Sequence, residues 1–284
     1  MNTKSSEFKK LLATLFKSHP WHGVSPGENA PQVVSSYIEI VPTGAVKLEL
    51  HKHTGHLHVD RPQRFSSMCP TLYGFVPQTY CGDRIGDFAA KKTKRSKIKG
   101  DGDPLDICVL TEKDFAHGDL FVTVRPIGGL RMIDHGEADD KIIAVLENDI
   151  AYGGIQDISE VPEGVIERLE HYFLSYKRPP MAKGEKPVVD IAAVYGRKEA
   201  HEVIRLSMAD YEEAYGTEES RLEQLRQLLS VASQPQPENG KVANGKGNSA
   251  KPAANKGKAK SKSNAKTTKS KQTKSGFPRH NPGK

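Results

Sequence analysis

Short runs in which apolar and polar residues alternate dominate the chain from about Val33 onward. In Val46-Lys47-Leu48-Glu49-Leu50 every second residue is apolar, which is the period of a strand with one polar face. Further short apolar runs predict strands at 37–41, 56–60, 105–110, 120–127 and 141–146. Because several short strands precede any long helix, we expect a small barrel or sandwich with helices added later.

The later part of the chain changes to the helical period. Apolar residues spaced three and four apart predict a helix over residues 162–177, with one face formed by Val165, Leu169, Tyr172, Phe173 and Tyr176. The segments that follow predict a strand at 187–194, a helix near 197–214 and a last amphipathic helix at 218–229.

Two segments break this sequence of elements. Residues 1–32 are predicted to be an N-terminal extension, in which Phe8, Leu11, Leu12, Leu15 and Phe16 recur at helical spacing before Pro20 and Pro26. Residues 82–100 are predicted to be an exposed basic loop, because this segment ends in six basic residues within nine positions: Lys91, Lys92, Lys94, Arg95, Lys97 and Lys99.

Charge is distributed very unevenly along the chain. After Ser233 there are 12 Lys and 1 Arg against 1 Glu, a net charge of +12, which leaves −5 for residues 1–233 because the whole chain carries +7. This Lys-rich segment, 234–284, has too few apolar side chains to offset the entropy of ordering, so we expect it to be disordered. The body is mildly acidic, which argues against a nucleic-acid binder that is basic throughout.

The three cysteines are Cys69, Cys81 and Cys108, without the C-x-x-C spacing of a zinc site and too few for a disulfide framework. A reducing compartment is therefore expected. The sequence has no apolar run of membrane-spanning length and no sustained apolar segment after Met1, so we expect a soluble, cytoplasmic protein without membrane association.

Candidate chemistry is concentrated in the acidic run that precedes the strand at 105–110. Asp101, Asp103 and Asp106 place three carboxylates within six residues, an arrangement that is costly unless a cation is present. Hard cations such as Mg²⁺ prefer oxygen ligands. A solvated acidic turn is the alternative reading. An EF-hand is rejected, since its sixth position requires Gly and is Asp106 here.

Further charged residues lie on other segments of the same domain. A second acidic group follows the strand at 120–127, consisting of Asp134, Glu137, Asp139 and Asp140, and taken alone it reads as a polar hairpin turn. Glu39, Lys47, Glu49 and Arg61 lie on predicted strands, and each taken alone reads as a solvated strand face. Together these residues supply carboxylates that could bind several cations and basic side chains that could bind phosphate oxygens. Phosphoryl transfer to water needs both kinds of group.

The run Asp101-Gly102-Asp103-Pro104-Leu105-Asp106 resembles the D-x-D-P-x-D signature of the family I soluble inorganic pyrophosphatases. Other short motifs follow in the family's order between about residues 33 and 215: Ile38-Glu39-Ile40, Lys47-Leu48-Glu49, Val59-Asp60-Arg61, the tyrosine-glycine segment Leu72–Thr79, the D-x4-D-x-K spacing of Asp134 through Lys141, and Tyr176-Lys177 at a helix end.

The resemblance implies a five-stranded OB-type β-barrel with flanking helices, and hydrolysis of pyrophosphate to two orthophosphates by a Mg²⁺-activated hydroxide. Asp103 would be the general base. Metal ligands would be Asp101, Asp106 and Asp139, with Glu39 and Asp134 holding further Mg²⁺ ions together with Asp139. Phosphate oxygens would be bound by Lys47, Arg61, Tyr73, Tyr176 and Lys177. Lys141 belongs with this substrate-binding set, and with Glu49 it would support the site.

The chain departs from the family pattern at Cys69, where a second tyrosine is common, and in the longer segment between Tyr73 and Asp101. We expect a catalytic domain at 33–215, an additional helix at 216–233, and a homo-oligomer whose order the sequence leaves open. The basic tail could bind polyanions weakly or be only solubilising.

Two other function classes are alternatives. A barrel that binds polyanions would carry basic and aromatic residues on its strands, whereas these strands carry carboxylates. A metal-dependent phosphodiesterase is disfavoured by the lack of metal-binding histidines.

Overall fold

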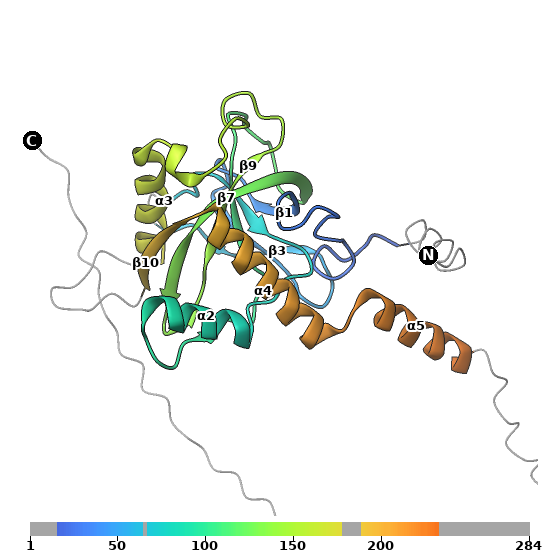
Figure 1. The fold of residues 1–284 in the computed structure, drawn as a ribbon. Coiled ribbons are helices and arrows are strands. Elements are labelled where there is room, and N and C mark those ends of the chain that lie inside the picture. Colours follow the sequence, from blue (N-terminus) through green and yellow to red (C-terminus); the bar gives the residue numbers. More distant parts are fainter. Residues whose placement is uncertain (1–15, 65–66, 178–188, 233–284) are drawn as a thin grey trace, which may run out of the picture. The chain divides into compact units, whose positions relative to one another are not determined.

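The computed structural model describes residues 16–64, 67–177 and 189–232 of the chain (Figure 1). The elements described here all belong to one compact unit. The predicted helical residues 8–15 and the Lys-rich tail at 234–284 lie outside the described residues. Among the described helices, none has both the length and the apolar character required to cross a membrane.

Most strands join one mixed, eight-stranded sheet, and two form a separate hairpin. The sheet contains β1 (Val34–Ile40), β4 (Leu72–Phe75), β5 (Lys99–Gly100), β6 (Asp106–Leu110), β7 (Leu120–Asp134), β8 (Glu137–Ala138), β9 (Lys141–Leu146) and β10 (Val189–Gly196). The hairpin consists of β2 (Val46–Leu50) and β3 (Leu57–Pro62). Pairing is parallel for β6–β9 and β5–β8, and antiparallel elsewhere.

Five strands pair in a closed ring, in the order β1, β4, β6, β9, β7 and back to β1. The ring closes because β7 is 15 residues long and changes partners along its length. Val124 and the residues before it pair with β1, Val124–Leu130 with β9, and Gly128–Asp134 with β10. A register shift between Pro126 and Gly128 marks the bend, as β-bulges commonly do.

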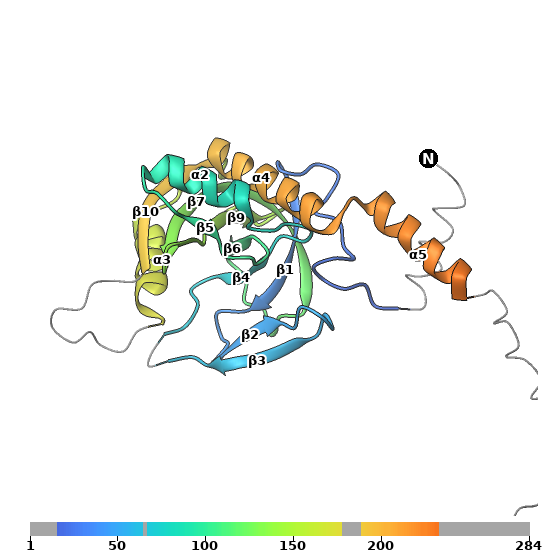
Figure 2. The same ribbon diagram turned by 90° about the horizontal axis from the view of Figure 1, so that it is seen from below.

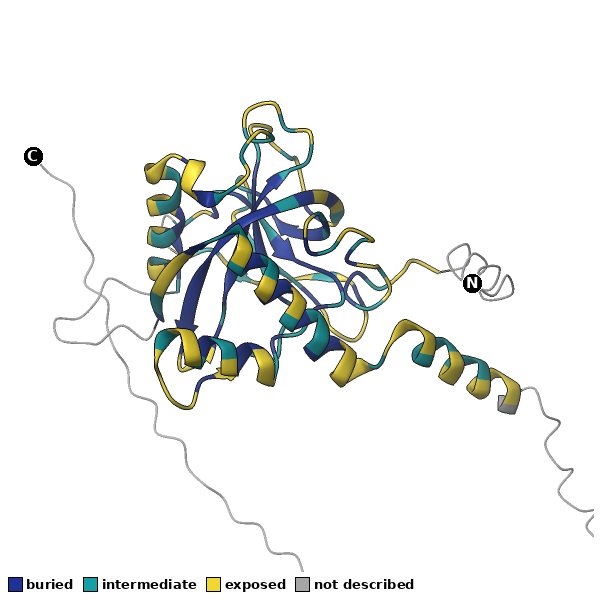
Figure 3. Ribbon diagram, in the orientation of Figure 1, coloured by how far each residue is buried: buried dark blue, intermediate teal, exposed yellow. Residues whose placement is uncertain are grey.

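The helices are α2 (Asp83–Thr93), α3 (Glu163–Ser175), α4 (Arg197–Tyr215) and α5 (Glu218–Ala232), with a 3₁₀ turn, η1, at Ile158–Glu160. Helices α2 and α4 lie side by side over the sheet, and the β2–β3 hairpin lies on the other side of the sheet from them (Figure 2). The central strands of the sheet, such as β1, β6 and β9, are largely buried, whereas the helices expose their outer faces (Figure 3).

Two apolar clusters form the main core, and strand alternation divides residues between them. Ile107 and Val109 of β6 pack in the cluster that includes Ile85 of α2 and Ile204 of α4. Cys108 and Leu110, on the opposite face of β6, pack in the second cluster. This cluster includes the inner face of α3: Leu169, Tyr172 and Phe173. Since β6 is buried on both faces, it reads as a continuous apolar run.

The predicted basic loop at 82–100 is wrong in its first half, where α2 forms. The helix buries Ile85, Gly86 and Ala89. Its N-terminus is capped by Asp210 of α4, whose carboxylate accepts the backbone N–H groups of Gly82, Arg84 and Ile85 at 3.0, 3.2 and 3.2 Å. A cap supplied by a residue so distant in the sequence leaves no local signal. The basic residues from Lys91 to Lys99 are exposed, as expected.

The alternating pattern at 46–50 and the helical period at 162–177 are confirmed by β2 and α3. The helices near 197–214 and 218–229 are confirmed as α4 and α5. Strand β7 extends past the predicted 120–127, and β4, β5 and β8 were not predicted. The predicted strand at 187–194 is found as β10 from Val189 onward, while residues 187 and 188 lie outside the described part.

Candidate active site

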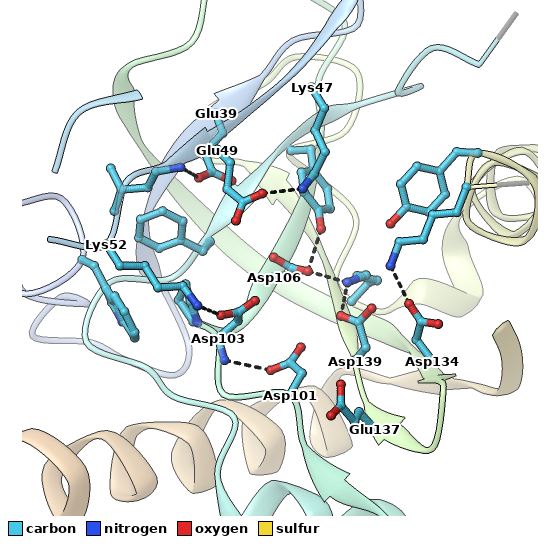
Figure 4. A pocket seen from close by; sticks show the side chains of 18 residues that line it. Glu39, Lys47, Glu49, Lys52, Asp101, Asp103, Asp106, Asp134, Glu137 and Asp139 are labelled. Atoms are coloured by element: carbon cyan, nitrogen blue, oxygen red, sulfur yellow. Dashed lines mark hydrogen bonds and ion pairs between the residues drawn. The ribbon is translucent and has the colours of Figure 1, made fainter. Parts of the chain in front are cut away.

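One cavity of about 230 Å³ collects charged side chains from nearly every part of the sheet and hairpin (Figure 4). Eight carboxylates line it: Glu39, Glu49, Asp101, Asp103, Asp106, Asp134, Glu137 and Asp139. Four lysines face them: Lys47, Lys52, Lys141 and Lys177. Tyr73, Tyr176, Trp21, Phe75, Leu50 and Pro104 complete the lining. The described lining therefore has twice as many acidic as basic groups.

Strand register places the centre of the site. Asp106 at the start of β6 is opposite Phe75 of β4 on one side and Lys141 of β9 on the other. The Lys141 ammonium donates to the carboxylates of both Asp106 and Asp139. The Tyr73 hydroxyl donates to Asp106 Oδ2 at 2.6 Å. Asp106 is thus held by two neighbouring strands.

The turn Asp101-Gly102-Asp103 precedes β6. Gly102 has a φ of +75°, a left-handed conformation that glycine adopts without steric cost. The Asp103 backbone N–H donates to Asp101 Oδ1 at 2.9 Å, and the Lys52 ammonium pairs with the Asp103 carboxylate. The turn consequently directs two carboxylates into the cavity a short distance apart.

A β-bulge directs Glu39 into the cavity. Ile38 pairs with Gly74 and Ile40 with Tyr73, so Glu39 is the extra residue of β1. Its carboxylate accepts the Leu50 backbone N–H at 2.7 Å, which ties β1 to the β2–β3 hairpin. Glu39 is buried.

A second bulge shapes the hairpin, where Lys47 pairs with Arg61 and Leu48 with Val59. The extra residue, Asp60, accepts from Lys47 Nζ at 3.0 Å and from Arg61 Nη1 at 2.6 Å. Lys47 also donates to Glu49 at 2.6 Å. Arg61 does not line the cavity. Its guanidinium lies 5.8 Å from the ring centre of Tyr176, and Tyr176 is one of the lining residues.

Helix α3 ends at the wall of the cavity that lies on the side of Asp134, away from Lys52 (Figure 4). Tyr176 is the C-cap residue of the helix, and Lys177 follows directly. The Lys177 ammonium pairs with Asp134 at the end of β7. His135 Nδ1 approaches the other Asp134 oxygen at 2.6 Å.

Burial disfavours the ionised form of three carboxyl groups in the cavity. Burial raises the pKa of Glu39 to about 8. Burial, with repulsion from Asp139 and Asp106, raises the pKa of Asp101 to about 8. Burial also raises the pKa of Asp139 to about 6, against the attraction of Lys141. Burial alone would lower the pKa of Lys141, but Asp106 and Asp139 hold it well above its usual range.

The structure brings together in this cavity every side chain predicted to act as base, metal ligand, substrate contact or support except Arg61, whose guanidinium lies 5.8 Å from the ring centre of Tyr176. Sequence reasoning missed Lys52 and Trp21, and it gave Glu137 no role. Lys47 and Glu49 follow the alternation of β2, whereas Lys52 lies in the turn beyond the strand, where periodicity no longer indicates a face. Asp140, grouped with Asp139 by sequence, points instead at Arg131.

Comparisons with known proteins identify the family of the chain. Residues 36–212 match the family described as inorganic pyrophosphatase. The inorganic pyrophosphatase of Chlamydia muridarum is 52% identical over 195 residues, which cover 68% of this chain and 93% of that protein. Soluble inorganic pyrophosphatase 2 of Chlamydomonas reinhardtii is 38% identical over 198 residues, 70% of this chain and 91% of the relative.

Among solved structures, the crystal structure of inorganic pyrophosphatase from Thermus thermophilus is similar with a TM-score of 0.56 and 32% identity, covering 69% of this chain and 99% of that one. These similarities define the class as a hydrolase, an inorganic diphosphatase. The chain belongs to the inorganic pyrophosphatase family, the family I enzymes that the run at Asp101–Asp106 indicated.

Proposed function

We propose that the chain hydrolyses pyrophosphate to two orthophosphates in this cavity, with Mg²⁺ as the activating ion. The observation that supports this most strongly is the pairing of an excess of carboxylates with four lysines in one small space. Carboxylates attract cations, and lysines together with those cations bind a compact, highly charged phosphate anion. A nucleic-acid groove would lack this excess of acid.

The residues fit a hard divalent cation by their donor chemistry. All the candidate ligands are carboxylate oxygens, and burial raises the pKa values of Asp101, Asp139 and Glu39, which a bound cation would oppose. Among the described residues no three side chains already form a ligand shell. Lys141 instead bridges Asp106 and Asp139. Asp101, Asp106 and Asp139 would hold the first ion, and Glu39, Asp134 and Asp139 further ones.

When bound, Mg²⁺ would neutralise phosphate charge and make the attacking water more acidic. The chain's own cations would then orient the substrate. Lys47 and Lys177 act as point charges on phosphate oxygens, and Arg61 can form a two-pronged contact from behind Tyr176. The Tyr73 and Tyr176 hydroxyls can donate further hydrogen bonds. Lys141 and Glu49 support these groups.

Asp103 is the proposed general base. Its side chain lines the cavity but is 45% exposed, so water can reach it. The oxygen of the attacking water bonds to one phosphorus, the bridging P–O bond breaks, and Asp103 accepts the proton of the water. The products are two orthophosphates.

We infer that the five-strand ring is the OB-type barrel of the family, within a catalytic domain at 33–215, followed by a helix at 216–233. We further propose a homo-oligomer. Light scattering of the purified protein tests this last point, and a purely monomeric species would contradict it.

Phosphate release tests the function. Purified protein should release orthophosphate from pyrophosphate in Mg²⁺ and stop in excess chelator. ATP and a phosphodiester, assayed under the same conditions, should be turned over far more slowly. Equal or faster turnover of the phosphodiester would contradict the proposal. A variant that lacks residues 234–284 should keep the turnover of the full-length chain. If the full-length chain binds polyanions in a salt-sensitive way, the truncated variant should bind them more weakly.

A further inference from the structure

A short N-terminal segment, His19-Pro20-Trp21-His22, lies before the residues that match the family and yet contributes to the cavity wall. Trp21 lines the cavity and is 2% exposed. Its indole Nε1–H donates to the Thr79 carbonyl at 2.8 Å, and its own carbonyl accepts the Gln78 N–H at 2.9 Å. The segment is therefore fastened to residues 78–79 by both side chain and backbone.

Residues 78–81 in turn hold the Asp103 turn. The Thr79 hydroxyl oxygen accepts the Leu105 N–H at 2.9 Å. The Cys81 N–H donates to the Asp103 carbonyl at 2.8 Å. Trp21 is thus connected to the backbone around the proposed base through residues 79–81, which it bonds at Thr79 and which bond Asp103 and Leu105.

His19 provides a second connection, through the hairpin. Its Nε2 lies 3.0 Å from the Lys52 carbonyl, and its Nδ1 accepts the Trp21 N–H at 3.2 Å. A carbonyl only accepts and a backbone N–H only donates, so the ring is neutral with its proton on Nε2. Burial lowers the pKa of His19, which favours this neutral form.

The hairpin turn fits closely against the same ring. Gly55 has a φ of +70°, and a Cβ added there would lie 2.9 Å from His19 Cδ2. From this turn the Lys52 side chain reaches the Asp103 carboxylate, on the side of the cavity away from Asp134 in Figure 4. His19 therefore sets the position of the backbone from which Lys52 extends.

At its other end the segment is anchored to α4. His22 Nδ1 and the Tyr211 hydroxyl are 2.8 Å apart, and the rings of Trp21 and His22 stack with centres 4.4 Å apart. Asp103 is thus approached from two directions by groups that the same anchored segment holds, its backbone through Trp21 and its carboxylate through Lys52.

We propose that His19 and Trp21 are positioning residues for Lys52 and Asp103, so that the segment His19–His22 is part of the active site. The inference rests on the proposed function, in which Asp103 accepts the proton. A half-exposed carboxylate does not hold one orientation by packing, and a displacement of about 1 Å at a reacting group can cost about 100-fold in rate.

The test compares ring-preserving variants. His19→Phe retains an aromatic ring and removes the hydrogen bond to the Lys52 carbonyl. Trp21→Phe likewise retains an aromatic ring and removes the hydrogen bond to the Thr79 carbonyl. Each should lower kcat for pyrophosphate about 10-fold to 100-fold, the scale of a small misplacement, while KM stays near the wild-type value. A loss of binding alone would raise KM instead.

Lys17→Met is the matched control. Lys17 belongs to the same N-terminal stretch and is largely exposed, but it pairs with Asp119 at 3.0 Å, away from the cavity lining. Its kcat should equal that of the wild type. A change of kcat within about twofold of the control is too small for a misplaced Asp103. If His19→Phe and Trp21→Phe fold and show only such a change, the proposal is wrong.

Lys52 provides a variant whose folding is not at risk, since its side chain is 45% exposed. Lys52→Met should lower kcat at unchanged melting temperature, and Lys52→Arg should restore most of it. Unchanged kcat in Lys52→Met would also overturn the proposal. If the wild type itself releases no orthophosphate from pyrophosphate, the proposed function fails, whereas an active wild type with indifferent variants refutes only this inference.

Discussion

Two buried polar clusters meet at consecutive residues of the chain and differ in their charge balance. Asp139 and Lys141 face the cavity, while Asp140 between them faces α2 and α4, because successive residues of an extended chain point to opposite sides. On that side, Arg131 Nη2 donates to Asp140 at 3.0 Å, and Nη1 pairs with Glu199 at 3.0 Å.

The Arg131 cluster is fully matched. The guanidinium lies 4.9 Å from the Phe88 ring centre and 5.0 Å from that of Tyr195. The Tyr195 hydroxyl donates to Asp140 at 3.0 Å, and Lys92 pairs with the same Glu199 that Arg131 contacts. Two acidic and two basic groups balance one another.

The comparison shows how structural and functional burial of charge differ in this protein. Both clusters incur the cost of desolvation, but the Arg131 cluster is neutral and saturated with partners. The cavity lining has eight carboxylates against four lysines, and burial together with repulsion from Asp139 and Asp106 raises the pKa of Asp101 to about 8. Such an excess is typical of functional sites, and it supports the proposed placement of the active site in this cavity.

The largest effect is expected at Asp103, on the functional side of the comparison. Asp103→Asn should lower kcat by about 10²- to 10⁴-fold, the usual scale for proton-transfer catalysis. Stability should change little, because the side chain is half-exposed. Steady-state kinetics and a thermal melt of the same preparation check both parts. Near-normal turnover would assign the base elsewhere.

The opposite outcome is expected on the structural side. Asp140→Ala leaves Arg131 buried without its main partner and should lower the free energy of unfolding by about 3–5 kcal/mol. Urea unfolding measures this. The double variant Arg131→Met with Asp140→Leu should recover most of the loss, because packed apolar side chains can replace a buried ion pair. A loss below about 1 kcal/mol for the single variant would remove the distinction between the clusters.

The excess of acid should also appear in the pH dependence of the metal-free protein. The folded pKa of Asp101, about 8, lies above its unfolded value, so the folded state binds the proton more tightly. This stabilisation is complete below about pH 4 and is lost as the pH rises through about 8. In chelator, Asp101→Asn should flatten the decline in melting temperature over that range.

Magnesium should oppose the same decline, because ligand binding to the folded state stabilises it. The informative contrast is wild type against Asp101→Asn, each with Mg²⁺ and with chelator, between pH 5 and 8. If the two proteins have the same pH profile in chelator, Asp101 does not carry uncompensated charge in the cavity.

The smallest effect is expected at the rim of the Arg131 cluster. The Lys92–Glu199 pair is 2.5 Å long, but the Lys92 side chain is 39% exposed. Lys92→Met should therefore change the free energy of unfolding by less than about 1 kcal/mol, and kcat not at all. A cost near that of Asp140→Ala would mean that the network depends on its outermost member.

Local patterns in the sequence were sufficient for much of the fold and most of the site. The alternation at 46–50 and the helical face of α3 predict those elements because periods of two and 3.6 residues follow from backbone geometry. The family followed from short motifs, above all Asp101-Gly102-Asp103-Pro104-Leu105-Asp106, in which Gly102 adopts the left-handed turn that directs its neighbours into the cavity.

Other features were decided only by tertiary structure. Helix α2 depends on a cap from Asp210, and Glu39 enters the cavity through a bulge defined by its pairing with β4. Lys52 pairs with Asp103, and Trp21 bonds to Thr79, through contacts between segments far apart in the chain. Sequence periodicity specifies which face a residue occupies within its own element. Caps, bulges and cavity walls are specified by the partner that lies opposite, and that partner is known only once the strands and helices have packed.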